Sequence, residues 1–242
     1  MGWMGNEDVA GAAGSSARLA FAGIAPVEAW GLDREERRVA GGDGGPVRRV
    51  SALALRGEME APFRWTIEPQ GVATLDEGVG RAACRRGRFD AVTGASFDSA
   101  ETRVEGENRS DGSYEVVARV TIEGLDLLGV VTADRIVAEV RGAVAAERAK
   151  GEVGSGPWNL SQTPFTPTGT EVVNLRILDA PVSFDSPLGC KIPIEGLGVL
   201  HLGELRLTPE VRRLTMLRLE LSGRVRGELA AGIVEIGEGS SD

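Results

Sequence analysis

Three side chains in this sequence could bind a soft metal ion or take part in nucleophilic catalysis: Cys84, Cys190 and His201. A structural zinc site needs four Cys or His ligands, usually in close pairs, so three are too few for one chain. A Ser-His-Asp or Cys-His site would have to use His201, the only histidine, as its base. No Gly-x-Ser-x-Gly motif is present, and Cys190 lies in no nucleophile motif. The sequence therefore predicts no metal site and no catalytic residue.

His201 lies in a run in which alternate residues are apolar, including Val199, Leu205 and Leu207. This period of two is typical of a strand, and it predicts that His201 points toward the core side. We expect a core or interface histidine with one hydrogen bond; a general base or pH switch is the alternative.

Basic residues gather in one short segment that could bind an anion. Four arginines fall within eight residues between two strand-like runs, namely Arg81, Arg85, Arg86 and Arg88. They could bind phosphate or pair with an acidic patch on a neighbouring subunit, although a solvated loop or strand edge is the favoured interpretation. The net charge of -9 argues against a nucleic-acid partner. No phosphate-loop motif occurs, and we predict no cofactor.

Two further clusters could carry function. The loop 154–168 combines aromatic and amide side chains that suit a sugar or peptide platform, and its candidate residues are Trp158, Asn159, Gln162 and Phe165. Such aromatics more often cap the open end of a sandwich. Paired carboxylates serve glycoside hydrolysis and oxygen clusters bind calcium, and the candidates are Glu101, Glu105, Glu107 and Asp111. Solvation and protection of a strand edge are the favoured explanation for these carboxylates.

The elements that must position these residues are strands. Apolar residues alternate with polar ones over 113–123, and similar patterns occur over 50–60, 132–141, 170–179 and 211–221. Glycines fall between such runs. We predict an all-β fold, an antiparallel sandwich or barrel of about ten strands, with a β-solenoid as the alternative.

The chain divides at a glycine-rich break over 41–46. Residues 1–46 are predicted to be a tail and an apolar arm, and residues 47–242 a β-rich body. The arm carries five large apolar side chains that need an apolar surface, namely Leu19, Phe21, Ile24, Trp30 and Leu32. Such an arm, joined through a hinge, can dock on a neighbouring subunit.

The compartment is inferred from signals that the sequence lacks. The first residues do not resemble a secretory signal peptide, and no apolar run approaches the length of a membrane-spanning helix. We expect a cytoplasmic protein without membrane insertion; export by a leaderless route, or after removal of a leader, is the alternative.

Three apolar runs in the C-terminal half, 128–134, 172–177 and 215–221, resemble segments of uncharacterised bacterial β-rich proteins. The named group that they resemble is the choice-of-anchor P family of surface proteins. Members of that family are exported and anchored, whereas this chain ends in the polar segment 237–242. The resemblance implies an all-β, non-catalytic protein and assigns no functional residue.

These observations favour a non-catalytic structural or self-associating β protein that forms a homo-oligomer or a larger assembly. The alternative is a monomeric carbohydrate- or peptide-binding module, or a carboxylate-based glycoside hydrolase. The aromatic content of 5% argues against a sugar-binding cleft.

Overall fold

The computed structural model describes residues 48–76, 79–91, 94–110, 113–144, 164–208 and 210–238. All of them belong to a compact unit that spans Val39–Asp242. They form sixteen strands, and this part of the chain contains no helix. Accordingly, the described residues include no helix that is long and apolar enough to span a membrane. The predicted N-terminal arm lies outside the described residues.

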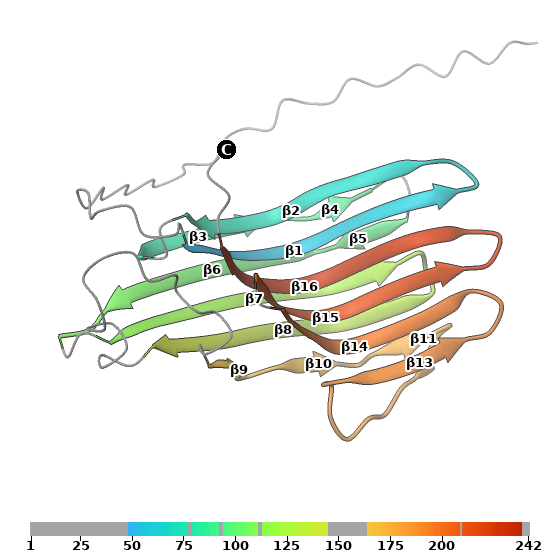
Figure 1. The fold of residues 1–242 in the computed structure, drawn as a ribbon. Helices are drawn as coiled ribbons and strands as arrows, with labels where there is room; N and C mark the ends of the chain where they lie inside the picture. The colour runs from blue at the N-terminus through green and yellow to red at the C-terminus, as the bar shows by residue number, and fades with distance from the viewer. Residues whose placement is uncertain are drawn as a thin grey trace, which may run out of the picture. The chain divides into compact units, whose positions relative to one another are not determined.

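The strands form two antiparallel sheets that face each other (Figure 1). The six-stranded sheet has the order β13 (Cys190–Ile194), β14 (Gly198–Leu207), β15 (Val211–Ser222), β16 (Arg226–Glu238), β1 (Arg48–Ala61) and β2 (Trp65–Leu75). The ten-stranded sheet contains β3 (Gly80–Arg86), β4 (Phe89–Asp90), β5 (Ala95–Phe97), β6 (Ser99–Asn108), β7 (Tyr114–Leu127), β8 (Val131–Val144), β9 (Phe165–Pro167), β10 (Glu171–Val173), β11 (Arg176–Ile177) and β12 (Ala180–Pro181). Both sheets keep free edges, so the predicted all-β fold is confirmed as a sandwich, and neither the barrel nor the solenoid describes it.

The number of strands exceeds the predicted ten because the outer rows of the larger sheet are broken into short pieces. Strands β9, β10 and β11 pair one after another with β8. The single strand predicted over 170–179 is therefore wrong. It is interrupted at Asn174, whose φ is 51°, a left-handed conformation that asparagine tolerates better than most residues.

Inner-facing apolar residues of both sheets form one core. In β7, Tyr114, Val116, Ala118, Val120 and Ile122 are all at most 4% exposed, as the alternation of the sequence predicted. Side chains of β1 and β16 cover them from the other sheet.

The buried face of β7 changes parity near its end. Up to Ile122 the buried residues are even-numbered, whereas Leu125 and Leu127 are the buried residues after it. Between them lies Gly124, whose φ is 64°. The left-handed conformation of Gly124 reverses the face to which the following side chains point. No extra residue is inserted, because the pairing with β8 keeps its register.

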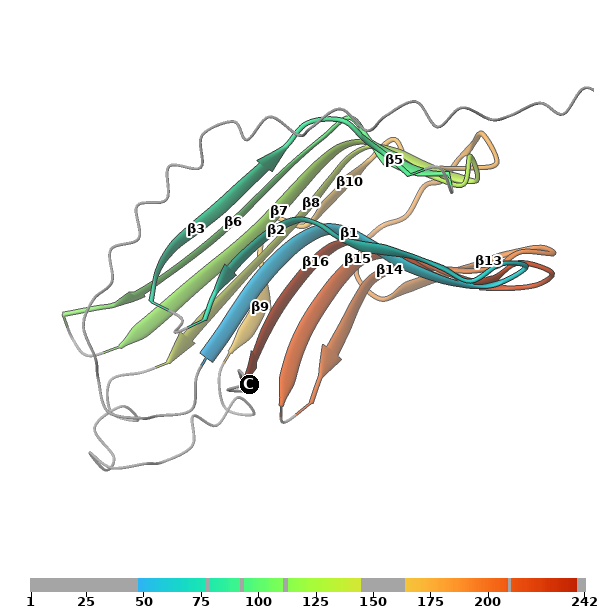
Figure 2. The ribbon, with the colours of Figure 1, turned by 90° about the horizontal axis from the view of Figure 1, so that it is seen from above.

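The same change occurs across the six-stranded sheet. One row of residues crosses it, and alternate members of that row are glycines with φ between 57° and 66°. From β14 to β2 the row is Gly203, Met216, Gly232, Ala54 and Gly71. Glycine kinks of this kind curve a sheet, and Figure 2 shows the strands of this sheet bending together.

Candidate functional site

The predicted aromatic platform is only partly visible. Trp158, Asn159 and Gln162 lie outside the described residues. Phe165 is the first residue of β9, is half-buried, and packs against the core. That such an aromatic caps an open end of the sandwich stays a prediction. The five arm residues, Leu19, Phe21, Ile24, Trp30 and Leu32, also lie outside the described residues.

The predicted basic and acidic clusters meet each other, because β3 pairs with β6. Arg81 Nε lies 3.3 Å from Glu105 Oε1, and Arg85 Nη2 lies 3.3 Å from Glu101 Oε1. These are cross-strand ion pairs between register partners, which stabilise a sheet and shield its edge. Two of the four arginines are thus neutralised by two of the candidate carboxylates.

The remaining members of the two clusters are peripheral. Arg86 stacks its guanidinium over Phe89, 5.2 Å from the ring centroid, and Arg88 is exposed. Glu107 lies 3.9 Å from Arg109, and Asp111 falls outside the described residues. The described part of the chain contains no group of His, Cys, Asp and Glu side chains that could hold a metal ion.

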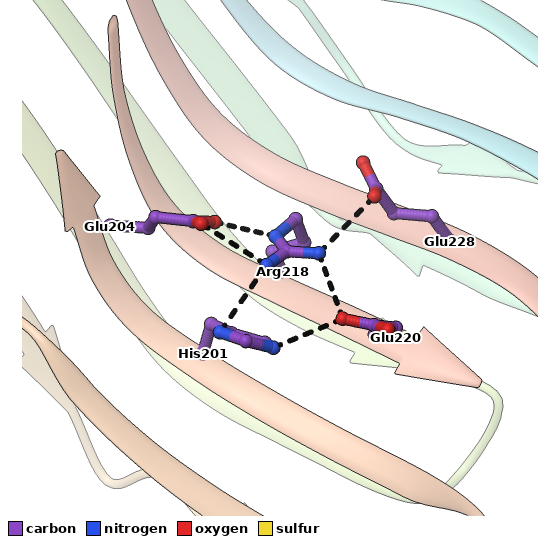
Figure 3. A network of polar contacts seen from close by, with 5 residues as sticks. All are labelled: His201, Glu204, Arg218, Glu220 and Glu228. Atoms are coloured by element: carbon purple, nitrogen blue, oxygen red, sulfur yellow. Dashed lines mark hydrogen bonds and ion pairs between the residues drawn. The ribbon is translucent and has the colours of Figure 1, made fainter. Parts of the chain in front are cut away.

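A network of five polar side chains lies on the outer face of the six-stranded sheet (Figure 3). Arg218 of β15 is at its centre: Nε donates to Glu204 Oε2 at 2.5 Å and Nη2 donates to Glu204 Oε1 at 3.1 Å. Its Nη1 donates to Glu220 Oε2 at 3.1 Å and to Glu228 Oε2 at 3.4 Å. The fifth member is His201 of β14. One guanidinium therefore binds carboxylates from three adjacent strands.

The geometry assigns the tautomer of His201. Arg218 Nη2 lies 3.3 Å from Nδ1 of the ring. A guanidinium only donates, so Nδ1 must accept and the proton of the neutral ring must sit on Nε2. Nε2 is buried and faces Glu220 Oε2 at 3.3 Å.

Burial and charge act against each other on Glu204 and Arg218. Burial alone raises the pKa of the Glu204 carboxyl, but the hydrogen bond and charge of Arg218 outweigh it and hold that pKa below its ordinary value. Burial likewise lowers the pKa of Arg218, but the hydrogen bond and charge of Glu204 outweigh it and raise the pKa. Each group thus stabilises the charged form of the other.

The bend of the sheet brings the network together. Residues 201 and 204 would point to opposite faces of a regular strand, because side chains alternate. Gly203, with φ 57°, lies between them and reverses the alternation. His201 and Glu204 therefore both reach Arg218 on the outer face.

The predicted orientation of His201 is wrong for the same reason. On the N-terminal side of Gly203 the inward residues are Leu200 and Leu202, both 0% exposed. His201 points to the other face, where its register partners are Lys191 and Arg218. It is still only 7% exposed, and its one hydrogen bond is the one from Arg218.

The register also keeps the histidine away from the neighbouring thiol. Cys190 is the partner of Leu202 and packs against the core, so it shares the inner face with that residue. His201 lies on the outer face. Cys84 and Cys190 are both free cysteines. Among the described residues, the polar contacts of His201 are therefore with Arg218 and Glu220, and neither is a nucleophile.

Glu204, Arg218, Glu220 and Glu228 were not among the candidate residues predicted from the sequence. A signal was present in the run 217–221, where Arg218 and Glu220 alternate with three leucines. That pattern places opposite charges on one face of a strand. It does not reveal that His201 and Glu204 of another strand lie beside them.

One of the comparisons with known proteins gives a match, and it covers strands β1 to β12. No curated protein and no solved structure matches the chain. A family model, described as a domain of unknown function, matches residues 48–187, more than half of the chain. The match includes β1 to β12 and ends before β13, so the polar network lies outside it. On this evidence the chain belongs to the family described as domain of unknown function DUF8256.

Proposed function

We propose that this chain is a non-catalytic structural β protein that associates with itself into a homo-oligomer or a larger assembly. The observation that carries this proposal is that charged side chains form ion pairs between adjacent strands. Arg81, Arg85 and Arg218 each bind a carboxylate of an adjacent strand. These are the groups from which an anion site or an acid–base pair would have to be built. Their charges instead hold neighbouring strands together.

Other pairs on the larger sheet follow the same rule. Arg119 of β7 lies 3.2 Å from Glu139 of β8, and Arg135 of β8 lies 3.3 Å from Glu123 of β7. Exposed pairs of this kind contribute about 0–1 kcal/mol each. Their value lies in fixing strand register and covering the faces with mixed charge. Such a surface suits a protein with a structural role.

Self-association is supported by apolar groups at the surface. Phe63, between β1 and β2, is 78% exposed, and Leu178, between β11 and β12, is 63% exposed. The apolar side chains of the segment 19–32 add a further demand for a covering surface. We propose that this arm docks on a second copy of the chain.

The experiment is the native mass of the full-length protein, measured by light scattering coupled to size exclusion. We expect a defined multiple of 25.4 kDa or a very large particle. Deletion of residues 1–40 should lower the number of chains per particle without loss of the β circular-dichroism signal. A matched variant keeps the length and charge and replaces only Leu19, Phe21, Ile24, Trp30 and Leu32 by serine.

The two variants separate the parts of the proposal. A monomeric full-length chain contradicts self-association. An oligomer that keeps its number of chains in both variants contradicts the role of the arm and leaves the body as the contact surface.

A further inference from the structure

The edge of the six-stranded sheet is uncovered over one short stretch of β14. Strand β13 pairs with β14 only from Gly198 to Leu202, and the last backbone contact is Gly189 N–H donating to Gly203 O at 3.1 Å. From Glu204 to Leu207, β14 pairs with β15 on one side. Among the described residues, no strand pairs with the other side.

The register indicates which backbone groups are free there. Thr208 N–H donates to Val211 O at 2.8 Å, so these two residues form a hydrogen-bonded pair. Hydrogen-bonded and non-hydrogen-bonded pairs alternate in an antiparallel ladder. The N–H and C=O groups of Leu205 and Leu207 therefore point outward, away from β15. An added strand would find two donors and two acceptors at the usual spacing.

The side chains of this edge have a definite pattern. Leu205 is the register partner of Leu214, which is 0% exposed, so Leu205 extends the inner apolar face to the rim. Leu205 is 41% exposed and Leu207 is 56% exposed. Arg206, between them, is exposed and points to the outer face. No carboxylate of the described residues lies within ion-pair distance of its guanidinium.

A notch adjoins this edge where β13 begins. It has a volume of about 360 Å³, and Leu188, Lys191, Glu204 and Leu205 are among the residues that line it. An apolar side chain of an added strand could enter it beside Leu188 and Leu205. Pockets of this kind give strand addition its specificity, whereas the backbone hydrogen bonds give affinity.

Other edges of the two sheets carry groups that discourage strand addition. The edge strand β3 carries Arg81, Arg85 and Arg86, while Pro69 lies in β2 and Pro193 in β13. Charged residues and proline protect edges against pairing. A two-fold axis at Arg206 would place this arginine opposite a second Arg206, and like charges directly opposite are destabilising. An axis at Leu205 would place Arg206 opposite Glu204 of the copy, whose carboxylate is already bound to Arg218.

We propose that the free edge of β14, Glu204 to Leu207, binds an extended segment of another protein as an added antiparallel strand, and that this segment carries an acidic residue between two apolar residues. The two apolar side chains lie opposite Leu205 and Leu207 on the inner face. The carboxylate lies opposite Arg206 on the outer face. That position is a non-hydrogen-bonded pair, where side chains of neighbouring strands approach most closely.

The test uses the full chain and two labelled peptides, Ser-Thr-Val-Glu-Val-Thr-Ser and the same peptide with Lys in place of Glu, in a fluorescence anisotropy titration. We expect the Glu peptide to bind about tenfold more tightly. The protein carries a net charge of -9, so non-specific attraction would favour the Lys peptide. A preference for the Glu peptide therefore reports the local arginine. In the variant Arg206→Glu the preference should reverse.

A second variant tests the backbone contacts. Leu207→Pro removes an N–H that the fold does not use, so the β circular-dichroism signal should remain while both peptides lose binding. Arg226→Glu, the matched control at an exposed position of β16, should leave the preference unchanged. Equal binding of the two peptides, no saturable binding, or binding unaffected by Leu207→Pro overturns the proposal. A native oligomer that Leu207→Pro dissociates also overturns it, because a second copy would then occupy the edge.

Discussion

Replacement of Arg218 by methionine tests whether the polar network holds the three strands together. Methionine keeps much of the apolar stem, so the change removes mainly the guanidinium. That group is 18% exposed in its side chain and binds three carboxylates. It also donates to Nδ1 of His201. Because hydrogen bonds to charged groups contribute about 1.5–3 kcal/mol and the remaining partners stay partly buried, we expect a loss of about 3 kcal/mol in the free energy of unfolding.

Arg213 on the same strand provides the matched control. It points to the same face, its side chain is 23% exposed, and it binds one carboxylate, that of Glu235, at 2.5 Å. We expect Arg213→Met to cost about 1 kcal/mol. The unfolding of both variants in urea is followed by circular dichroism. We expect the free energy of unfolding to fall with urea concentration at the same slope as in the parent chain. If Arg218→Met costs no more than Arg213→Met, the idea that one guanidinium links three strands is refuted.

Two further predictions concern the same sheet. Since the fold holds the pKa of Glu204 below its ordinary value of 4.5, the charged carboxylate adds stability above that value and loses it as the pH falls through the folded pKa. Glu204→Gln should therefore destabilise the protein at about pH 7 in urea denaturation, and its difference from the parent should shrink as the pH falls below 4.5. A difference that does not shrink in acid contradicts this. Gly232→Ala should lower the free energy of unfolding by about 2 kcal/mol, because φ is 66° and the new Cβ meets Met216 Cβ at 3.1 Å. The control Gly129→Ala, with φ 64° and no atom within 4 Å of the new Cβ, should lower it by about 1 kcal/mol in the same thermal or urea unfolding. Equal losses in the two variants would contradict a packing role for Gly232.

Much of the fold could be predicted from the sequence, because alternation is a local signal. The pattern from Tyr114 to Ile122 gave the strand, its buried face and the all-β class correctly. The alternation fails at the bend, where Gly124 and Gly203 reverse the inward face without changing the register. Extrapolating one parity through Gly203 put His201 on the wrong side.

The candidate site was less accessible to sequence reasoning. The basic and acidic clusters were both recognised, but their mutual neutralisation depends on the pairing of β3 with β6, which no local pattern specifies. The network around Arg218 depends on the order of β14, β15 and β16 and on the bend as well. A parity change at a glycine inside an otherwise regular strand pattern is the signal that could have indicated the bend.

The pairing of β1 with β16 has a consequence for folding. These two strands share twelve register pairs, although they stand at opposite ends of the described chain. The ten-stranded sheet uses only residues between them, so its hairpins can form on the ribosome while β1 is paired with β2 alone and still lacks β16. Closure of the smaller sheet must wait for the C-terminal strand, and long-range pairing of this kind slows folding. During that interval the edge of β1 that later pairs with β16 stays unpaired, which makes the nascent chain a natural client for chaperones.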